Sequence, residues 1–176
     1  MKIAFDMDGV LRDIDMGFFK LCQTIGWKET GQAFKLKAIW NSPPSFNPMY
    51  LALPTDQVVC ITNCSTAGAV DRKARWLKHY YGERVELYPV QVAIDAWGLD
   101  YCVPVAMAKL DIMRALKVDV YFDDDPLIIR ALRLMDSGIK FMKLGYVIEE
   151  YNGTNPPATD QQILDKMQEI LLERDK

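Results

Sequence analysis

The side chains best suited to chemistry are acidic, and they fall in two groups that lie far apart in the sequence. Asp6 and Asp8 follow a short apolar run near the N-terminus, and Asp123 and Asp124 follow another one. Carboxylates that are brought together repel each other, so they either take up protons or are neutralised by a cation. Oxygen ligands suit Mg²⁺ better than zinc. The two groups therefore predict a Mg²⁺ site.

A hydroxyl and a lysine accompany these carboxylates. Thr62 ends another apolar run, and Lys109 lies in the amphipathic stretch that precedes Asp123. A site that only stores metal ions needs neither a lysine nor a threonine. A phosphate-binding site can use both, because the lysine supplies positive charge and the threonine supplies a directed hydrogen bond. Phosphoryl transfer depends mostly on positioning and charge neutralisation. The set therefore favours phosphate chemistry, with Lys117, which lies closer to Asp123, as the alternative lysine.

The elements that must position these residues alternate along the chain, as in an α/β fold with a parallel sheet. Strands are expected at 2–6, 57–61, 84–88, 118–122 and 139–144. Helices are expected at 66–81, 105–117, 126–135 and 160–173, with Pro104 near the start of the second and with Gly82 and Gly138 ending the first and third. Ligands bind at the carboxyl ends of the strands in such a sheet, which is where the polar residues lie.

Two segments do not fit this alternation. Residues 14–56 are too long for a plain crossover, are rich in aromatic residues and end in a proline-rich stretch, so we interpret them as a small, mainly helical cap. The catalytic core is then 1–13 together with 57–176. Residues 89–103 form a second segment that we expect to be irregular. The aromatic residues of the cap segment are Phe18, Phe19, Trp27, Phe34, Trp40, Phe46 and Tyr50.

The composition excludes several classes of protein. The formal net charge is −3 and the sequence pI is about 5.2, so no overall basic field attracts nucleic acid or anionic membrane. Asp6 and Asp8 interrupt the apolar N-terminus before a signal peptide can form, and no run of about 18 apolar residues predicts a membrane span. We therefore expect a cytoplasmic protein, a monomer or a homodimer, with no membrane partner; nucleic acid is disfavoured as a partner, although a local basic patch could still bind it.

Cysteine and histidine offer little for catalysis or for zinc. Without a signal peptide the cysteines are expected to be reduced, and their spacing is not that of a zinc site. His79 is the only histidine, so a Ser–His–Asp triad lacks material, and we expect it on a helix surface. We interpret the cysteines as small apolar fillers of the core. They are Cys22, Cys60, Cys64 and Cys102.

Four motifs in order resemble those of the haloacid dehalogenase (HAD) superfamily. The stretch from Phe5 to Leu11, Phe-Asp-Met-Asp-Gly-Val-Leu, is similar to its first motif. Thr62, Lys109 and Asp123-Asp124 are similar to the second, third and fourth. The resemblance spans roughly residues 2 to 145. It implies a three-layer, Rossmann-like α/β fold whose five parallel strands follow the order 5-4-1-2-3.

The resemblance also implies a two-step, Mg²⁺-dependent mechanism. Asp6 attacks phosphorus and forms an aspartyl-phosphate, while Asp8 protonates the leaving oxygen and then helps to activate water. Thr62 and Lys109 bind the phosphoryl oxygens with Asn63, whose backbone N–H assists. The implied metal ligands are the Asp6 carboxylate, the Asp8 backbone carbonyl and Asp123, with Asp124 acting through water. Members that cleave carbon–halogen bonds lack the second aspartate, so Asp8 favours phosphate chemistry.

A narrower resemblance, to the 5′(3′)-deoxyribonucleotidase branch, concerns the stretch from Asp6 to Leu11 followed by Asp13. It implies a nucleoside monophosphate as substrate. The chain departs from that branch at Ile14, where an aromatic residue is common, and at Arg12, where a small one is typical. Another small metabolite, a nucleic-acid terminal phosphate and transfer to an acceptor other than water therefore stay open.

Other classes of protein remain as alternatives. A receiver domain of a signalling system also combines acidic residues, threonine and lysine, but in a different order along the chain. A catalytically silent domain that binds a phosphorylated ligand or a protein partner is expected to have lost Asp6 or Asp8, and both are present. For Asp125, next to Pro126, a helix N-cap is the better interpretation.

Overall fold

The sheet of the computed structural model has the strand order that the sequence predicts. The structure describes residues 1–12, 42–45, 47–92, 98–144 and 158–174. Its strands are β1 Lys2–Phe5, β2 Gln57–Asn63, β3 Val85–Val90, β4 Val120–Asp123 and β5 Lys140–Lys143. They pair in parallel in the order β3-β2-β1-β4-β5, which is the predicted order written in reverse. The three-layer α/β fold is confirmed.

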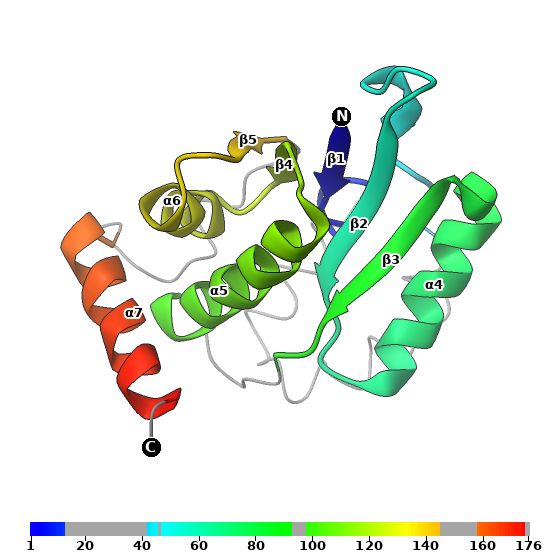
Figure 1. The fold of residues 1–176 in the computed structure, drawn as a ribbon. Helices are drawn as coiled ribbons and strands as arrows, with labels where there is room; N and C mark the ends of the chain where they lie inside the picture. The colour runs from blue at the N-terminus through cyan, green and yellow to red at the C-terminus, as the bar shows by residue number, and fades with distance from the viewer. Residues whose placement is uncertain (13–41, 46, 93–97, 145–157, 175–176) are drawn as a thin grey trace.

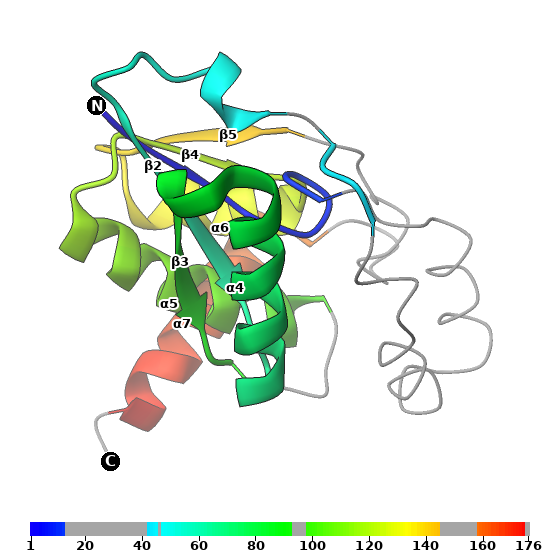
Figure 2. The same cartoon turned by 90° about the vertical axis from the view of Figure 1, so that its right-hand side faces the viewer.

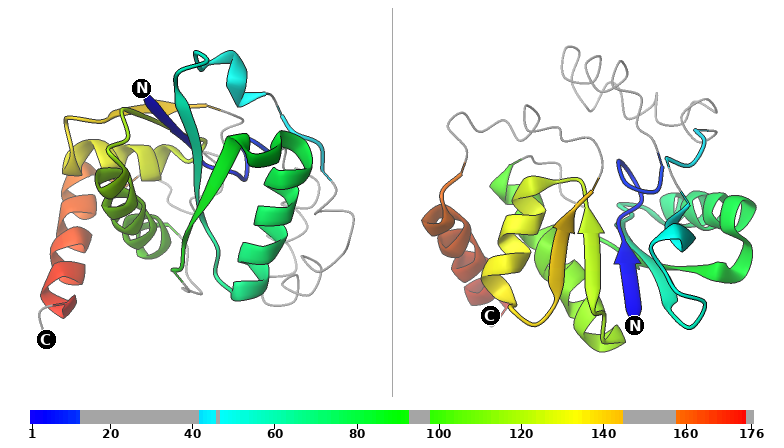
Figure 3. Two further views of the ribbon diagram at one scale, coloured as in Figure 1. Left: turned by 45° about the vertical axis from the view of Figure 1, so that its right-hand side comes forward. Right: turned by 90° about the horizontal axis from the view of Figure 1, so that it is seen from above.

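Helices cover both faces of this sheet (Figures 1 and 3). The helices are α4 Ala67–Tyr81, α5 Leu99–Leu116, α6 Pro126–Met135 and α7 Asp160–Arg174, with short 3₁₀ turns at Pro48–Tyr50 and Gly82–Arg84. α4 packs its buried Trp76 and Leu77 against one face. α5 and α6 cover the other, and α7 packs on them through Ile163 and Met167. The C-terminal helix thus joins the outer layer as predicted.

Local signals in the sequence explain why most boundaries agree with the prediction. Thr66 caps α4 by accepting a hydrogen bond from the backbone N–H of Ala69, and Gly82 ends this helix at a φ of +64°. Asp125 caps α6 by accepting from the N–H groups of Leu127 and Ile128, as expected for an N-cap before proline. The N-cap interpretation of Asp125 is therefore confirmed.

The start of α5 was predicted wrongly. The helix begins at Leu99, so Pro104 lies inside it, and residues 99–103 are helical rather than irregular. Proline lacks one backbone N–H, which removes a single hydrogen bond near the start of the helix. Cys102, Val103 and Val105 are buried around it, and this packing outweighs that loss. Residues 89–90 belong to β3, and Trp97 lies outside the described residues.

The two ends of the long segment after β1 meet beside the sheet. The Ser45 N–H donates to the Leu11 carbonyl at 2.9 Å, and the Trp76 indole of α4 donates to the Ser42 carbonyl at 2.9 Å. The chain therefore leaves at Arg12 and returns next to that point (Figure 2). The predicted helical cap falls mostly on residues outside the described ones, and so do all of its aromatic residues except Tyr50, which is 84% exposed.

The remaining predictions about single residues concern cysteine and histidine. Cys60, Cys64 and Cys102 are buried free thiols, as fillers of the core should be, and Cys22 lies outside the described residues. Burial raises the pKa of all three thiols, which keeps them protonated. His79 is exposed on α4 as expected. Among the described helices, none has the length and apolar character needed to cross a membrane.

Candidate active site

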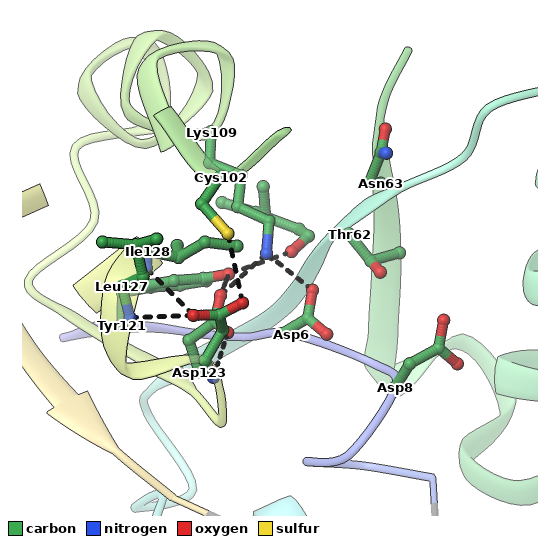
Figure 4. Close-up of polar contacts among 12 residues, drawn as sticks. Asp6, Asp8, Thr62, Asn63, Cys102, Lys109, Tyr121, Asp123, Leu127 and Ile128 are labelled. Atoms are coloured by element: carbon green, nitrogen blue, oxygen red, sulfur yellow. Dashed lines mark hydrogen bonds and ion pairs between the residues drawn. The ribbon is translucent and has the colours of Figure 1, made fainter. Parts of the chain in front are cut away.

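Adjacent strands deliver the predicted acidic residues to one edge of the sheet (Figure 4). Asp6 follows β1 directly, and Asp123 ends the neighbouring strand β4. The backbone N–H of Asp6 donates to the Phe122 carbonyl at 2.8 Å, which continues the strand pairing into the site. Parallel pairing therefore brings the two acidic motifs together although they are far apart in sequence.

Lys109 of α5 connects the two carboxylates through its ammonium group. It is 2% exposed, and its Nζ donates to Asp6 Oδ1 at 2.8 Å and to Asp123 Oδ2 at 2.7 Å. Burial by itself lowers the pKa of Lys109, but the charges of Asp123 and Asp6 outweigh burial and raise that pKa well above its usual range. Lys117, the alternative lysine, is exposed just beyond the C-terminal end of α5. The structure therefore brings Lys109, and not Lys117, to the carboxylates.

The buried Tyr121 also holds Asp123. Its hydroxyl donates to Asp123 Oδ2 at 2.6 Å, and the Asp125 backbone N–H donates to Asp123 Oδ1 at 3.0 Å. The Lys109 ammonium also lies 5.5 Å from the centre of the Tyr121 ring, a distance at which cation–π attraction operates. Asp123 is therefore fixed in one orientation. The strand position of Tyr121, on the same face as Asp123, was the available sequence signal.

Three carboxylates form the acidic part of the site: Asp6, Asp123 and Asp124 each offer an oxygen, and these oxygens lie within 4.8 Å of one another. Within the described residues, no hydrogen-bond donor reaches the Asp124 carboxylate. Burial and the charges of Asp123 and Asp6 raise the pKa of Asp124 well above its usual range. Burial also raises the pKa of Asp6, which Lys109 offsets only in part.

These three carboxylates fit a divalent cation. When all three groups are ionised, the ammonium of Lys109 balances one of their three negative charges, and a divalent cation would balance the other two. All of the offered ligand atoms are carboxylate oxygens, which hard cations such as Mg²⁺ prefer. Of the four acidic residues expected near the metal, the Asp8 carboxylate is not part of this group. The group of Asp8 that is expected to coordinate the metal is its backbone carbonyl, and this coordination stays a prediction.

Gly9 makes the close approach of Asp124 possible. Its φ is +83°, and a Cβ placed on it would lie 2.1 Å from Asp124 Oδ2. Only a residue without a side chain adopts this turn and leaves the carboxylate in place. The glycine of the first motif therefore has a physical reason in this structure: it lets the loop after β1 contact the loop after β4.

Asp8 lies apart from the other carboxylates, between two cations. Lys73 of α4 contacts its Oδ2 at 2.7 Å, and Arg12 forms an ion pair with its Oδ1. Burial raises the pKa of Asp8, but Arg12 and Lys73 together outweigh burial and lower the pKa well below its usual range. Backbone bonds close the loop, with the Arg12 N–H donating to the Met7 carbonyl at 2.8 Å, and this turns Arg12 back onto Asp8.

Thr62 and Asn63 extend from β2 towards the same edge. Thr62 is 1% exposed, and its hydroxyl oxygen accepts a hydrogen bond from Lys73 at 2.8 Å. The Asn63 side chain bonds the backbone of Val92 at 3.1 and 3.2 Å and the hydroxyl of Tyr101 at 3.2 Å. The amide side chain thus anchors the chain after β3, which leaves the backbone N–H as the group proposed to bind phosphate.

Sequence reasoning missed Lys73 and gave Arg12 no role. Lys73 lies on the buried face of α4, because Ala69, Trp76 and Leu77 are spaced from it as residues on one side of a helix are. A lysine within an apolar helix face was therefore the signal. For Arg12 the signal was its departure from the small residue of the nucleotidase branch. The structure shows both side chains buried next to Asp8.

Comparisons with known proteins add little to this geometry. The sequence matches no model of a protein family and no curated protein. Among solved structures, the chain is similar to the HAD domain of the effector protein Lem4 from Legionella pneumophila, with 12% identity and a TM-score of 0.39 over 97% of this chain and 93% of that chain. At this identity and TM-score the likeness says nothing about activity, which has to be inferred from the side chains themselves.

Proposed function

We propose that the chain is a Mg²⁺-dependent phosphomonoester hydrolase of the HAD type. The observation that carries this proposal is the position of Asp6. Its carboxylate is buried at the end of β1, with Lys109 on one oxygen and two further carboxylates within 4.8 Å. A buried nucleophile beside a fixed lysine and a candidate cation site is the arrangement that phosphoryl transfer requires.

The roles follow from the contacts. Lys109 holds Oδ1 of Asp6, which leaves Oδ2 to attack phosphorus, so that a new oxygen–phosphorus bond forms as the bond to the leaving oxygen breaks. Bound Mg²⁺ would neutralise charge on the transferred phosphoryl group. Asp6, Asp123 and Asp124 would hold it. Arg12 and Lys73 keep Asp8 as a carboxylate, the form that would take a proton from the water of the second step. Protonation of the leaving oxygen in the first step would require Asp8 to separate from these two cations and bind a proton.

The substrate class we propose is a small phosphorylated metabolite in the cytoplasm, with a nucleoside monophosphate as the first candidate. Support for the nucleotide comes from the resemblance of the stretch from Asp6 to Leu11 and from the aromatic residues of the segment 14–56. A sugar phosphate and a nucleic-acid terminal phosphate are the competing substrates. Relative rates on a substrate panel distinguish the three.

A second candidate function is a silent domain that binds a phosphorylated ligand. The observation in its favour is that both oxygens of Asp8 are engaged by cations, so neither is free to give a proton to a leaving group in this conformation. Binding of a phosphorylated ligand without turnover would support it. The two functions differ in whether Asp6→Asn abolishes an activity or leaves ligand affinity unchanged.

The experiment that tests the proposal is hydrolysis of p-nitrophenyl phosphate with and without Mg²⁺. The native chain is compared with Asp6→Asn and with Asp71→Asn, a control at an exposed aspartate of α4. We expect Mg²⁺-dependent turnover in the native chain and the control, and a loss of at least about 1,000-fold in Asp6→Asn, because the nucleophile is removed. Equal turnover in Asp6→Asn would overturn the covalent mechanism.

If p-nitrophenyl phosphate is not hydrolysed, Mg²⁺ binding tests the proposed metal site instead. Titration with Mg²⁺ then compares the native chain with Asp123→Asn. Weaker binding in Asp123→Asn would support the proposed metal site. Equal affinity would reject Asp123 as a ligand, and phosphate binding without turnover would favour the silent domain.

A further inference from the structure

Lys73 is a buried charge in a place where an apolar side chain would pack. It lies about two turns into α4, is 4% exposed and shares the helix face of Trp76. Burial lowers its pKa, but the charges of Asp8 and Asp6 outweigh burial, so the ammonium stays protonated with a raised pKa. A buried ion pair contributes little to stability compared with apolar packing. Stability alone therefore does not explain why a lysine is buried at this position, and the explanation must come from the contacts of its ammonium group.

The ammonium group uses all of its donors. A lysine has three N–H donors and no acceptor. Lys73 Nζ contacts Asp8 Oδ2 at 2.7 Å, Thr62 Oγ1 at 2.8 Å and the Asn63 carbonyl at 2.8 Å. No donor remains for a further ligand in this arrangement. The role of Lys73 is thus to hold its three partners relative to one another.

The contact with Thr62 restricts the directions in which its hydroxyl proton can point. Because Lys73 only donates, it occupies a lone pair of Thr62 Oγ1 and leaves the O–H of the threonine as a donor. Within the described residues, no acceptor takes that proton, although the side chain is 1% exposed. An O–H that is buried, fixed and unused at the carboxyl end of β2 is suited to a phosphoryl oxygen.

We propose that Lys73 is a positioning residue which aims the Thr62 hydroxyl at the phosphoryl group. This inference rests on the proposed phosphatase function. Thr62 would donate the hydrogen bond to the transferred group, and Lys73 would act through Thr62. Lys109, by contrast, contacts the nucleophile itself. The two buried lysines therefore have different tasks.

A double-mutant cycle tests the coupling between the two side chains. Thr62→Val removes the hydroxyl at nearly constant shape, and Lys73→Met removes the charge at nearly constant length. We expect Thr62→Val to lower kcat by about 100-fold, as for the loss of one fixed donor to a developing charge. Lys73→Met should lower kcat by about 10- to 100-fold, with a smaller rise in KM. When Thr62→Val is already present, Lys73→Met should cost less than about 3-fold more.

The outcomes separate positioning from a structural role. If the two losses multiply, Lys73 does not act through Thr62 and the inference is wrong. If Lys73→Met raises KM and leaves kcat unchanged, Lys73 binds the substrate directly, which also overturns it. Thermal melts accompany each variant, and Lys73→Gln replaces Lys73→Met if the latter does not fold.

A second readout does not depend on turnover. Calorimetric titration with inorganic phosphate in the presence of Mg²⁺ should show weaker binding in both single variants and no further weakening in the double variant. A native chain that hydrolyses phosphate esters while the cycle is additive would retain the proposed function and reject the role of Lys73. A native chain that neither turns over nor binds phosphate would overturn both.

Discussion

Two buried lysines divide the site into halves of opposite charge. Around Lys109, one ammonium faces the three carboxylates Asp6, Asp123 and Asp124. Around Lys73, a single carboxylate, Asp8, faces two cations, because Arg12 is its second partner. The first half is therefore short of positive charge and suited to a metal cation. The second has positive charge in excess and is suited to the anionic phosphoryl group that would lie between the two halves.

The pKa shifts agree with this division. In the Lys109 half, burial and neighbouring carboxylates raise the pKa of Asp124 and of Asp6. In the Lys73 half, Arg12 and Lys73 lower the pKa of Asp8 in spite of burial. Aspartates of one motif, two positions apart, thus differ in the direction of their shift. The environment of each carboxylate, rather than its residue type, therefore determines the direction in which its pKa is shifted.

The largest effect on stability is expected when each of the two lysines is replaced by methionine. Lys109→Met leaves two buried carboxylates without their ammonium partner and should destabilise the fold by about 3–5 kcal/mol. Lys73→Met should cost only about 1–2 kcal/mol, because Asp8 is part-exposed and keeps Arg12. Urea denaturation at pH 7 without divalent cations measures both free energies of unfolding. Equal costs would mean that the two halves do not differ in charge balance as described.

The next largest effect is expected from Gly9→Ala, which tests whether Gly9 allows the loops after β1 and β4 to come together. Gly9→Ala combines a positive φ with a Cβ only 2.1 Å from Asp124 Oδ2, whereas Gly82→Ala has a positive φ and no atom within 4 Å of the Cβ. We expect a loss of about 1–2 kcal/mol for Gly82→Ala from backbone strain alone. Gly9→Ala should cost about 1–2 kcal/mol more, since Asp124 must move. It should also weaken Mg²⁺ binding, which Gly82→Ala should leave unchanged; unchanged binding in both would separate Gly9 from the metal site.

The Lys109 half was largely predictable from the sequence because each of its parts has a local signal. Asp6 and Asp123 end short apolar runs, and the parallel order of the strands then places them together. The start of α5 was not predictable from Pro104, since proline is common at the first helical position and tolerated a turn or so later. Only the packing of Cys102 and Val103 determines which of these applies.

The Lys73 half was not predicted because its contacts are tertiary. Lys73 belongs to α4, Arg12 to the loop after β1, and Thr62 to β2, and no spacing in the sequence connects the three. A lysine at a helix position that faces the core is the one local sign. Its partners become clear only when the fold places Asp8, after β1, and Thr62, at the end of β2, within reach of that helix face.

The smallest expected effect concerns Asp124 and its dependence on pH. Because the folded state raises the pKa of Asp124, this residue binds a proton more strongly in the folded state than in the unfolded chain. Its contribution to stability should therefore fall as pH rises from about 4 through that raised pKa. Asp124→Asn should then raise Tm at pH 8 without divalent cations by about 2–4 °C, and should have little effect at pH 4. Thermal melts at both pH values, with Asp71→Asn as the exposed control, measure this.

Addition of Mg²⁺ should reverse the order of the two proteins. The cation neutralises the carboxylates of the Lys109 half, so it should raise the Tm of the native chain more than that of Asp124→Asn, and more at pH 8 than at pH 5. Asp8→Asn should leave the Mg²⁺-dependent part of this stabilisation nearly intact, since its carboxylate lies in the other half. An equal loss of stabilisation in Asp8→Asn and Asp124→Asn would mean that one charge field covers both halves and that the division between them is wrong.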